Sequence, residues 1–128
     1  ILNEGSDVTI VATGHLVWES LIAAEKLYAK GTSVEVINIH TIKPLDEKLI
    51  IESVKKTRAI VTAEEHNILG GLGESISRTL SLNFPTPQEF IGTNDTFGES
   101  GTPNQLMKKY GLNSSNIISK VEKVLLRK

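Results

Sequence analysis

The stretch EEHNILGGLGES, residues 64–75, gathers carboxylates, a histidine and glycines, residue types that recur in catalytic and anion-binding loops. A carboxylate or an imidazole at the end of a buried strand can move protons when its pKa is shifted. Glycines between a strand and a helix can present backbone N–H groups to a phosphate at the helix N-terminus. The stretch therefore allows three interpretations: an acid–base site, a phosphate cradle, or a turn from a strand to a helix.

The spacing of the glycines favours the turn. Gly70, Gly71 and Gly73 fit neither the dinucleotide fingerprint G-x-G-x-x-G nor the P-loop pattern G-x-x-x-x-G-K-S/T. Glu64 and Glu65 lie just upstream, where a bound phosphate would meet negative charge. Glycine also permits unusual backbone angles and lets a helix pack close to a strand. A structural role thus explains the stretch with fewer assumptions than either chemical role.

The rest of the chain offers little further chemistry. Neither His15 nor His40 has a metal-ligand spacing to an acidic residue or another histidine. His15 follows Gly14 at a predicted helix start, which favours a local hydrogen bond or an interface contact. The chain has no cysteine, hence no disulfide, thiol nucleophile or thiolate metal site, and it has no G-x-S-x-G elbow. We therefore predict no catalytic residue and no metal ligand in this chain.

Around these residues the hydrophobic pattern switches between the periods of strands and helices. Short β-branched runs predict strands, apolar residues three and four apart predict helices, and Asp46 is a predicted N-cap. Such alternation forms parallel βαβ units, hence an α/β fold with three layers, α/β/α. Gly14, His15 and the opening stretch then lie at the carboxyl ends of strands, where such sheets bind ligands. The predicted strands are 7–13, 33–39, 59–65 and 88–92, and the predicted helices are 15–30, 43–56, 72–82, 103–110 and 114–128.

The composition is that of one ordinary globular domain, residues 1–128. Lys and Arg number 14 against 15 Asp and Glu, so no global field would attract nucleic acid or an anionic membrane. No stretch reaches the roughly 18 apolar residues needed to span a bilayer. The basic tail KVEKVLLRK is typical of a last helical turn. Because the chain lacks both cysteine and an initiator Met, we expect a fragment of a larger cytoplasmic protein.

Three stretches of the chain together resemble one family. They are EGSDVTIVATG (residues 4–14), TAEEHNILGGLGES (62–75) and IGTNDTFGESGTPNQLMKKYGL (91–112). In this order and spacing they are similar to the C-terminal domain of transketolase and its thiamine-diphosphate-dependent relatives. Within the third stretch, Asp95, Phe97, ESG and YGL resemble the transketolase branch more than deoxyxylulose-phosphate synthase or the beta subunit of 2-oxo-acid dehydrogenases.

The resemblance implies a mostly parallel sheet of five strands, in which one short edge strand, at or before Ile1–Leu2, runs antiparallel. It implies that thiamine diphosphate and Mg²⁺ are bound by separate pyrophosphate-binding and pyrimidine-binding domains, which are partners of this chain. This chain is then expected to bind no cofactor. The parent enzyme, by resemblance a homodimer of the pentose phosphate pathway, transfers a two-carbon ketol unit between sugar phosphates.

The resemblance thus predicts an assembly domain, with a proposed regulatory role in the family, that is inactive alone. Two alternatives stay open. One is a regulatory small-molecule or anion site at the strand ends. The other is a partner-docking domain of a 2-oxo-acid dehydrogenase beta subunit or of deoxyxylulose-phosphate synthase. The candidate regulatory or interface residues are Gly14, His15, Glu65, His66, Gly70, Gly71 and Gly73.

Overall fold

The computed structural model describes residues 1–40, 44–67, 71–93 and 112–128. Strands and helices alternate along these ranges as the hydrophobic pattern predicts, with ends that differ by a few residues. The predicted helix at 103–110 and most of the 91–112 motif lie outside the described residues. The elements are β1 (Val8–Ala12), α1 (Leu16–Ala29), β2 (Val34–Asn38), α2 (Glu47–Thr57), β3 (Ile60–Asn67), α3 (Leu72–Asn83), β4 (Gln88–Thr93) and α5 (Ser114–Leu126).

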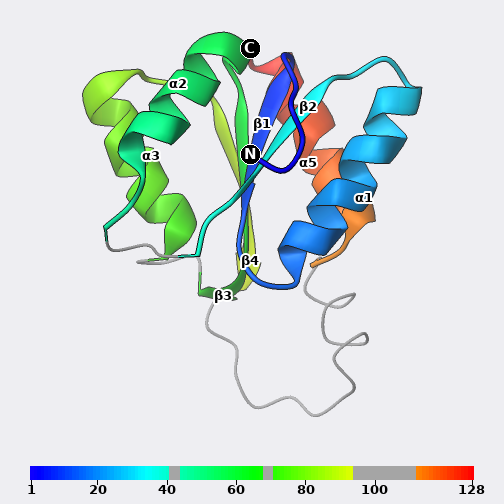
Figure 1. Ribbon diagram of the computed structural model, residues 1–128, viewed down its shortest axis with the longest axis horizontal. Coiled ribbons are helices and arrows are strands. Elements are labelled where there is room, and N and C mark those ends of the chain that lie inside the picture. Colours follow the sequence, from blue (N-terminus) through cyan, green and yellow to red (C-terminus); the bar gives the residue numbers. More distant parts are fainter. Residues whose placement is uncertain (41–43, 68–70, 94–111) are drawn as a thin grey trace.

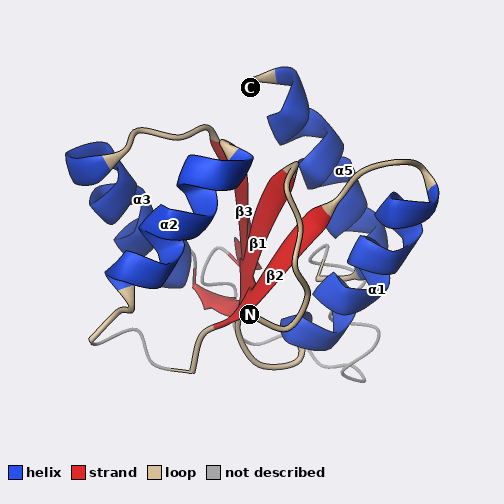
Figure 2. Cartoon of the chain, turned by 45° about the horizontal axis from the view of Figure 1, so that its top comes forward, coloured by secondary structure: helices blue, strands red, loops and turns tan. Residues whose placement is uncertain are grey.

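The strands form one parallel sheet of four in the order β2-β1-β3-β4. Helices α1 and α5 cover one face of this sheet, and α2 and α3 cover the other (Figure 1 and Figure 2). The predicted three-layer α/β/α fold is therefore confirmed. The chain first moves outward from β1 to β2 and then crosses back past β1 to β3, so the strand order reverses between β1 and β3. Open α/β sheets bind ligands beside the carboxyl ends of strands at such a reversal.

Both faces of the sheet are closed by apolar clusters, which is why the strands are almost continuously apolar. Ile10 belongs to the cluster that α1 and α5 complete, whereas the next residue, Val11, belongs to the cluster that α2 and α3 complete. Both side chains are fully buried. Successive side chains of a strand point to opposite faces, so neighbouring residues at a strand end also reach different helices.

The antiparallel edge strand implied by the resemblance is not among the described elements. Beside β2, the N-terminal segment makes an isolated antiparallel bridge between Asn3 and Val36. The N–H of Val36 donates to the oxygen of Asn3 at 2.8 Å, and the N–H of Leu2 donates to the oxygen of Val36 at 2.8 Å. One bridge does not make a strand, because a ladder repeats over several consecutive pairs. Within the described ranges the sheet has four strands, where five were expected.

Charge fastens α5 to the edge strand β4. The Glu89 carboxylate accepts a hydrogen bond from Arg127 at 2.6 Å and lies 3.6 Å from Lys123 and 3.8 Å from Lys120. Arg127 also donates to the backbone oxygen of Gln88 at 2.8 Å. From the sequence alone, the favourable position of cations at a helix C-terminus is enough to explain the basic tail. The structure adds an acidic partner, Glu89, on the strand beside α5.

A buried carboxylate fixes α2 on β2. The Glu35 side chain is fully buried and accepts hydrogen bonds from Lys56 and Ser53, both at 2.5 Å. Its other donor is the backbone N–H of Gly5 at 3.3 Å, and Ser53 is also bonded to Thr9 of β1 at 2.7 Å. Burial alone would raise the pKa of Glu35, but these hydrogen bonds and the charge of Lys56 outweigh it. The pKa of Glu35 therefore lies below its ordinary value of 4.5.

We expect Glu35→Gln to lower the free energy of unfolding by about 1–3 kcal/mol near neutral pH, because an amide cannot replace the charged hydrogen bonds. A carboxyl whose folded pKa is depressed stabilises the protein fully above its unfolded pKa, here about 4.5. This contribution is lost as the pH falls through the folded pKa, so the difference between the two proteins should shrink in acid. Urea unfolding of both proteins from neutral pH down to below pH 4.5 measures the difference in their free energies of unfolding. The variant Glu52→Gln, at an exposed position of α2, is the control. A difference that does not change with pH would contradict the assignment.

Candidate functional site

The first carboxylate of the opening stretch stabilises the helix that follows it. Glu64 of β3 is 4% exposed and accepts hydrogen bonds from the backbone N–H groups of Leu72, at 2.9 Å, and Gly73, at 2.7 Å. These residues begin α3, and the first N–H groups of a helix have no partner within it. The N-cap residue Gly71 has no side chain to satisfy them. Glu64 therefore acts as a cap supplied by the preceding strand, and its charge is favourable at a helix N-terminus.

Gly73 lets α3 lie close to the sheet. A Cβ atom at this position would come within 2.7 Å of the Phe90 ring and within 2.7 Å of the Thr62 hydroxyl oxygen. Gln88 of β4 links α3 to β3 at this contact, because its Nε2 donates to the backbone oxygen of Gly73 at 2.9 Å and to the Thr62 hydroxyl at 3.1 Å. Gly73 is therefore required for the packing of α3 against β3 and β4.

The second carboxylate of the stretch points to the opposite face and stabilises α1. Oε1 of Glu65 accepts the backbone N–H of His15, the N-cap residue of α1, at 2.6 Å. Gly14 turns the chain there with a φ of +58°, and a Cβ on Gly14 would lie 3.3 Å from the Glu65 carboxyl carbon. The positive φ favours glycine at this position. Three of the residues predicted for the strand-end edge are thus brought together by the fold.

The two glutamates decide what this edge can do chemically. The N–H groups of Leu72 and Gly73, which a phosphate cradle would use, already bind the Glu64 carboxylate. A phosphate at this place would have to displace that carboxylate or share a small volume with its charge. A buried carboxylate that accepts two backbone hydrogen bonds is also held by the protein rather than directed at a substrate. The geometry therefore favours the turn from strand to helix over both chemical interpretations.

The other candidate residues add less. Gly71 is the N-cap of α3, and its φ of −93° does not require glycine. The backbone of His66 belongs to β3, but its side chain, like the whole of Gly70, lies outside the described residues. The His40 ring is bonded to the Asn38 side chain at 3.2 Å. Among the residues that the structure describes, no group of three or more His, Asp or Glu could hold a metal ion, and no helix is long and apolar enough to cross a bilayer.

The roles of Glu35 in β2 and Glu89 in β4, which bind basic side chains of α2 and α5, were not predicted from the sequence. Glu35 lies within VEVIN, a strand whose neighbouring residues are buried. A charged residue is almost never fully buried unless it is paired. The position of Glu35 within an apolar run was therefore the one sign in the sequence that it has a charged partner. Glu89 carries a weaker signal because it follows the polar Gln88 at the start of its strand. Their partners Lys56 and Arg127 are 21 and 38 residues away in the sequence, and nothing local points to them.

Known proteins resemble this chain over nearly its whole length. The family described as "Transketolase, C-terminal domain" matches residues 1–117. The chain is 44% identical over 128 residues to "6-deoxy-6-sulfo-D-fructose transketolase subunit SqwH" of Clostridium sp. (strain MSTE9), covering 100% of this chain and 40% of the relative. It is 36% identical over 124 residues to "1-deoxy-D-xylulose-5-phosphate synthase" of Desulforudis audaxviator (strain MP104C), covering 95% of this chain and 20% of the relative. The solved structure "Split gene transketolase, inactive beta4 tetramer" has a TM-score of 0.94 and 44% identity, covering 98% of this chain and 41% of that one.

The chain is a doubly wound α/β domain, because its parallel sheet carries helices on both faces. In this domain the carboxylates of β3 bind the domain's own helices. The chain belongs to the transketolase C-terminal domain family. The resemblance seen in the three sequence stretches is thereby confirmed. The chain spans about 40% of the length of the transketolase subunit that it matches and about 20% of the length of the synthase.

Replacing Glu64 tests its structural role. Glu64→Ala should lower the free energy of unfolding by about 2 kcal/mol, because two backbone N–H groups of α3 lose their acceptor. Urea unfolding followed by circular dichroism measures this change. Glu122→Ala, an exposed position on α5, is the control and should shift the free energy by no more than about 0.5 kcal/mol. Equal stability of the two variants would refute the capping role and would make Glu64 a catalytic candidate again.

Proposed function

We propose that this chain is the C-terminal assembly domain of a transketolase-type enzyme and has no transferase activity by itself. The parent enzyme would transfer a two-carbon ketol unit between sugar phosphates. One observation carries the proposal: at the edge where ligands would bind, Glu64 and Glu65 are already hydrogen-bonded to the N-termini of α3 and α1. In such an enzyme thiamine diphosphate stabilises the carbanion, and this domain contributes by holding the catalytic domains in place.

The names of the relatives support a partnership with other domains. One relative is called a transketolase subunit, and one solved structure is titled a split gene transketolase. We infer that the pyrophosphate-binding and pyrimidine-binding domains, with thiamine diphosphate and Mg²⁺, are the partners of this chain in a homodimeric cytoplasmic enzyme. Those domains would also select the sugar. The clostridial relative is named for a sulfosugar, whereas our expectation from the resemblance is the pentose phosphate pathway.

Two structural proposals accompany this function. The isolated bridge between Asn3 and Val36 supports a fifth, antiparallel edge strand beside β2. The apolar cluster under α1 and α5 supports a single domain over residues 1–128, because it joins Val8 near one end of the chain to Val124 near the other.

A regulatory anion site at the same edge is the second candidate. It is favoured by the contact of Gly14, His15 and Glu65 at the strand reversal, and it is disfavoured by the engaged N–H groups of α3. Isothermal titration with inorganic phosphate, a sugar phosphate and a nucleotide separates the two functions. We expect that none of these three ligands gives a heat signal that saturates, because none binds the chain. Saturable binding that disappears in a folded Gly71→Val variant would decide for the regulatory site.

A docking domain of a 2-oxo-acid dehydrogenase beta subunit, or of deoxyxylulose-phosphate synthase, is the remaining alternative. The synthase relative supports the second of these. Co-purification with a lipoyl-bearing acyltransferase, in place of transketolase catalytic domains, would decide for the dehydrogenase.

An activity assay tests the leading proposal. We expect the purified 128-residue chain, supplied with thiamine diphosphate, Mg²⁺, a ketose phosphate and an aldose phosphate, to transfer no ketol unit. The catalytic domains from the same source, expressed with this chain, should co-purify with it and catalyse the transfer. Ketol transfer by the chain alone would refute the proposal, and so would catalytic domains that neither bind the chain nor need it.

A further inference from the structure

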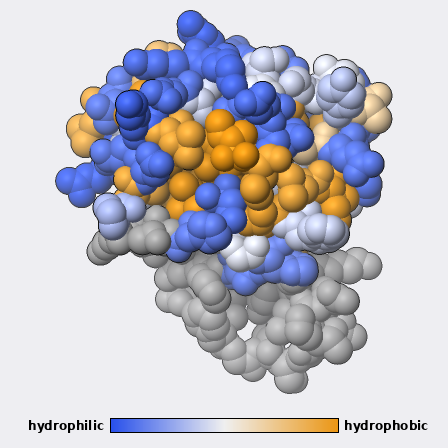
Figure 3. Space-filling view, viewed as in Figure 1, coloured by the Kyte–Doolittle hydropathy of each residue, from blue (hydrophilic) through white to orange (hydrophobic). Residues whose placement is uncertain are grey.

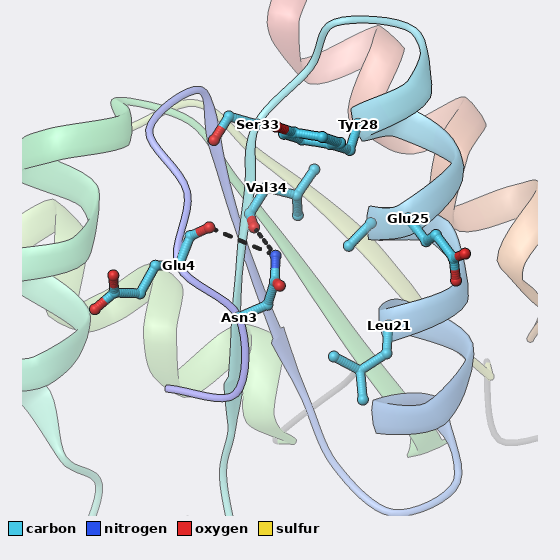
Figure 4. Close-up of a pocket in the computed structure, with 8 residues that line it drawn as sticks. Asn3, Glu4, Leu21, Glu25, Tyr28, Ser33 and Val34 are labelled. Carbon is cyan, nitrogen blue, oxygen red and sulfur yellow. Dashed lines mark hydrogen bonds between the residues drawn. The ribbon is translucent and has the colours of Figure 1, made fainter.

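The first six residues cross the edge strand β2 before the chain enters β1. The N–H of Val36 donates to the oxygen of Asn3 at 2.8 Å, and Nδ2 of Asn3 donates to the oxygen of Val34 at 2.7 Å. Figure 4 shows the contact between Asn3 and Val34, with the N-terminal segment passing across β2. We call residues 1–6 the N-terminal strap.

Gly5 is the point at which the N-terminal strap crosses the backbone of β2. A Cβ atom at this position would come within 2.2 Å of the Val34 carbonyl carbon and 2.5 Å of the Glu35 nitrogen, so only glycine fits. The N–H of Gly5 donates to Oε1 of the Glu35 side chain at 3.3 Å. The same Oε1 accepts a hydrogen bond from Lys56 of α2 at 2.5 Å. Glu35 therefore joins the N-terminal strap to α2 through a single oxygen atom.

Little apolar burial holds the N-terminal strap in place. Ile1 is 54% exposed and Leu2 is 52% exposed, and Asn3 is exposed as well. Figure 3 shows this apolar surface on the side of the molecule where Figure 1 places the N-terminus. Between the strap and α1 lies a groove of about 420 Å³, whose lining includes Asn3, Leu21 and Tyr28. A segment with few buried apolar contacts opens at a low cost in free energy.

A pair of hydrogen bonds marks the end of the N-terminal strap. The N–H of Asp7 donates to the oxygen of Ser33 at 2.9 Å, and Oδ2 of Asp7 accepts the N–H of Ser33 at 2.7 Å. These two residues lie directly before β1 and β2, whose pairing begins with Val8 and Val34. The strap can therefore leave β2 while β1 and β2 stay paired.

We propose that residues 1–6 open and close over the edge of β2 independently of the rest of the domain, and that Glu35 holds the closed strap on α2 through Gly5. Opening removes the partners of the Val36 N–H and oxygen, which are Asn3 and Leu2. An edge strand with unpaired backbone groups is a template for pairing with another strand. The N-terminal strap thus controls access to this edge, and this role does not depend on the proposed transketolase function.

Amide hydrogen exchange of the full chain, followed by NMR, tests the independent opening. The N–H of Val36 is bonded to the strap, whereas the N–H of the fully buried Thr9 is bonded to Ala59 within the sheet at 2.9 Å. Val36 therefore reports opening of the strap, and Thr9 reports unfolding of the sheet. After correction for intrinsic rates, Val36 should exchange at least about 100-fold faster than Thr9. Equal protection of the two amides would overturn the proposal.

The variant Glu64→Ala separates opening of the strap from unfolding of the domain. It weakens the start of α3, so the exchange rate of Thr9 should rise by about 30-fold. The rate of Val36 should stay the same, because the strap opens without α3. A parallel rise at Val36 would show that the strap opens only when the whole domain unfolds.

The variant Glu35→Gln tests whether Glu35 holds the strap. A neutral amide is a weaker acceptor than a carboxylate, so Val36 should exchange about fivefold faster. Gly5→Ala should raise the same rate by about 30-fold, because the added Cβ does not fit on β2. In the double variant, Glu35→Gln should add nothing further, because the displaced strap no longer reaches position 35. Ser6→Ala, at the exposed neighbouring position, is the matched control and should leave the rate unchanged.

Two results would overturn the role of Glu35. One is an unchanged Val36 rate in Glu35→Gln. The other is a double variant in which the two effects multiply, because Glu35 would then act on the strap by a route other than Gly5. Should Gly5→Ala fail to fold, the comparison of Val36 with Thr9 and the single variant Glu35→Gln still decide the proposal.

Discussion

Two successive carboxylates in the C-terminal half of β3 bind the N-termini of two helices on opposite faces of the sheet. Glu64 binds the first N–H groups of α3, and Glu65 binds the N–H of His15 at the start of α1. Neighbouring residues of a strand face opposite ways, so one dipeptide fixes a helix on each side. This happens where the strand order reverses, the usual ligand edge of such a sheet. The helix N-termini that would attract an outside anion therefore already have anionic partners within the protein.

A glutamate of the sheet also binds each of the other two described helices, there through a basic side chain near the C-terminal end of the helix. Glu35 of β2 holds α2 through Lys56, and Glu89 of β4 holds α5 through Arg127. Each of the helices that the structure describes is thus fastened to a strand by a glutamate, in addition to its apolar contacts. Burial of apolar surface is the larger favourable term, but it has no direction. A charged hydrogen bond has a direction and a length, so the glutamates set where each helix lies along the sheet.

These internal contacts support the assembly role proposed above. Carboxylates that could act as acids or bases are instead used to position helices. Large apolar side chains that the fold leaves exposed are spread over several elements, with Trp18 and Tyr28 on α1, Leu82 on α3 and Leu126 on α5. Single exposed apolar side chains of this kind are common on protein surfaces.

The sequence by itself determined the α/β class, the order of the described elements, the cap at Asp46 and the family, because these depend on residues within a few positions or on short motifs. Only the tertiary structure decided the roles of the glutamates. The partners of Glu64 are 8 and 9 residues away, whereas the partner of Glu65 is 50 residues away. Which distant segments meet depends on the strand order and on the face to which each side chain points. Neither can be read from the local pattern of a strand that is apolar on both faces.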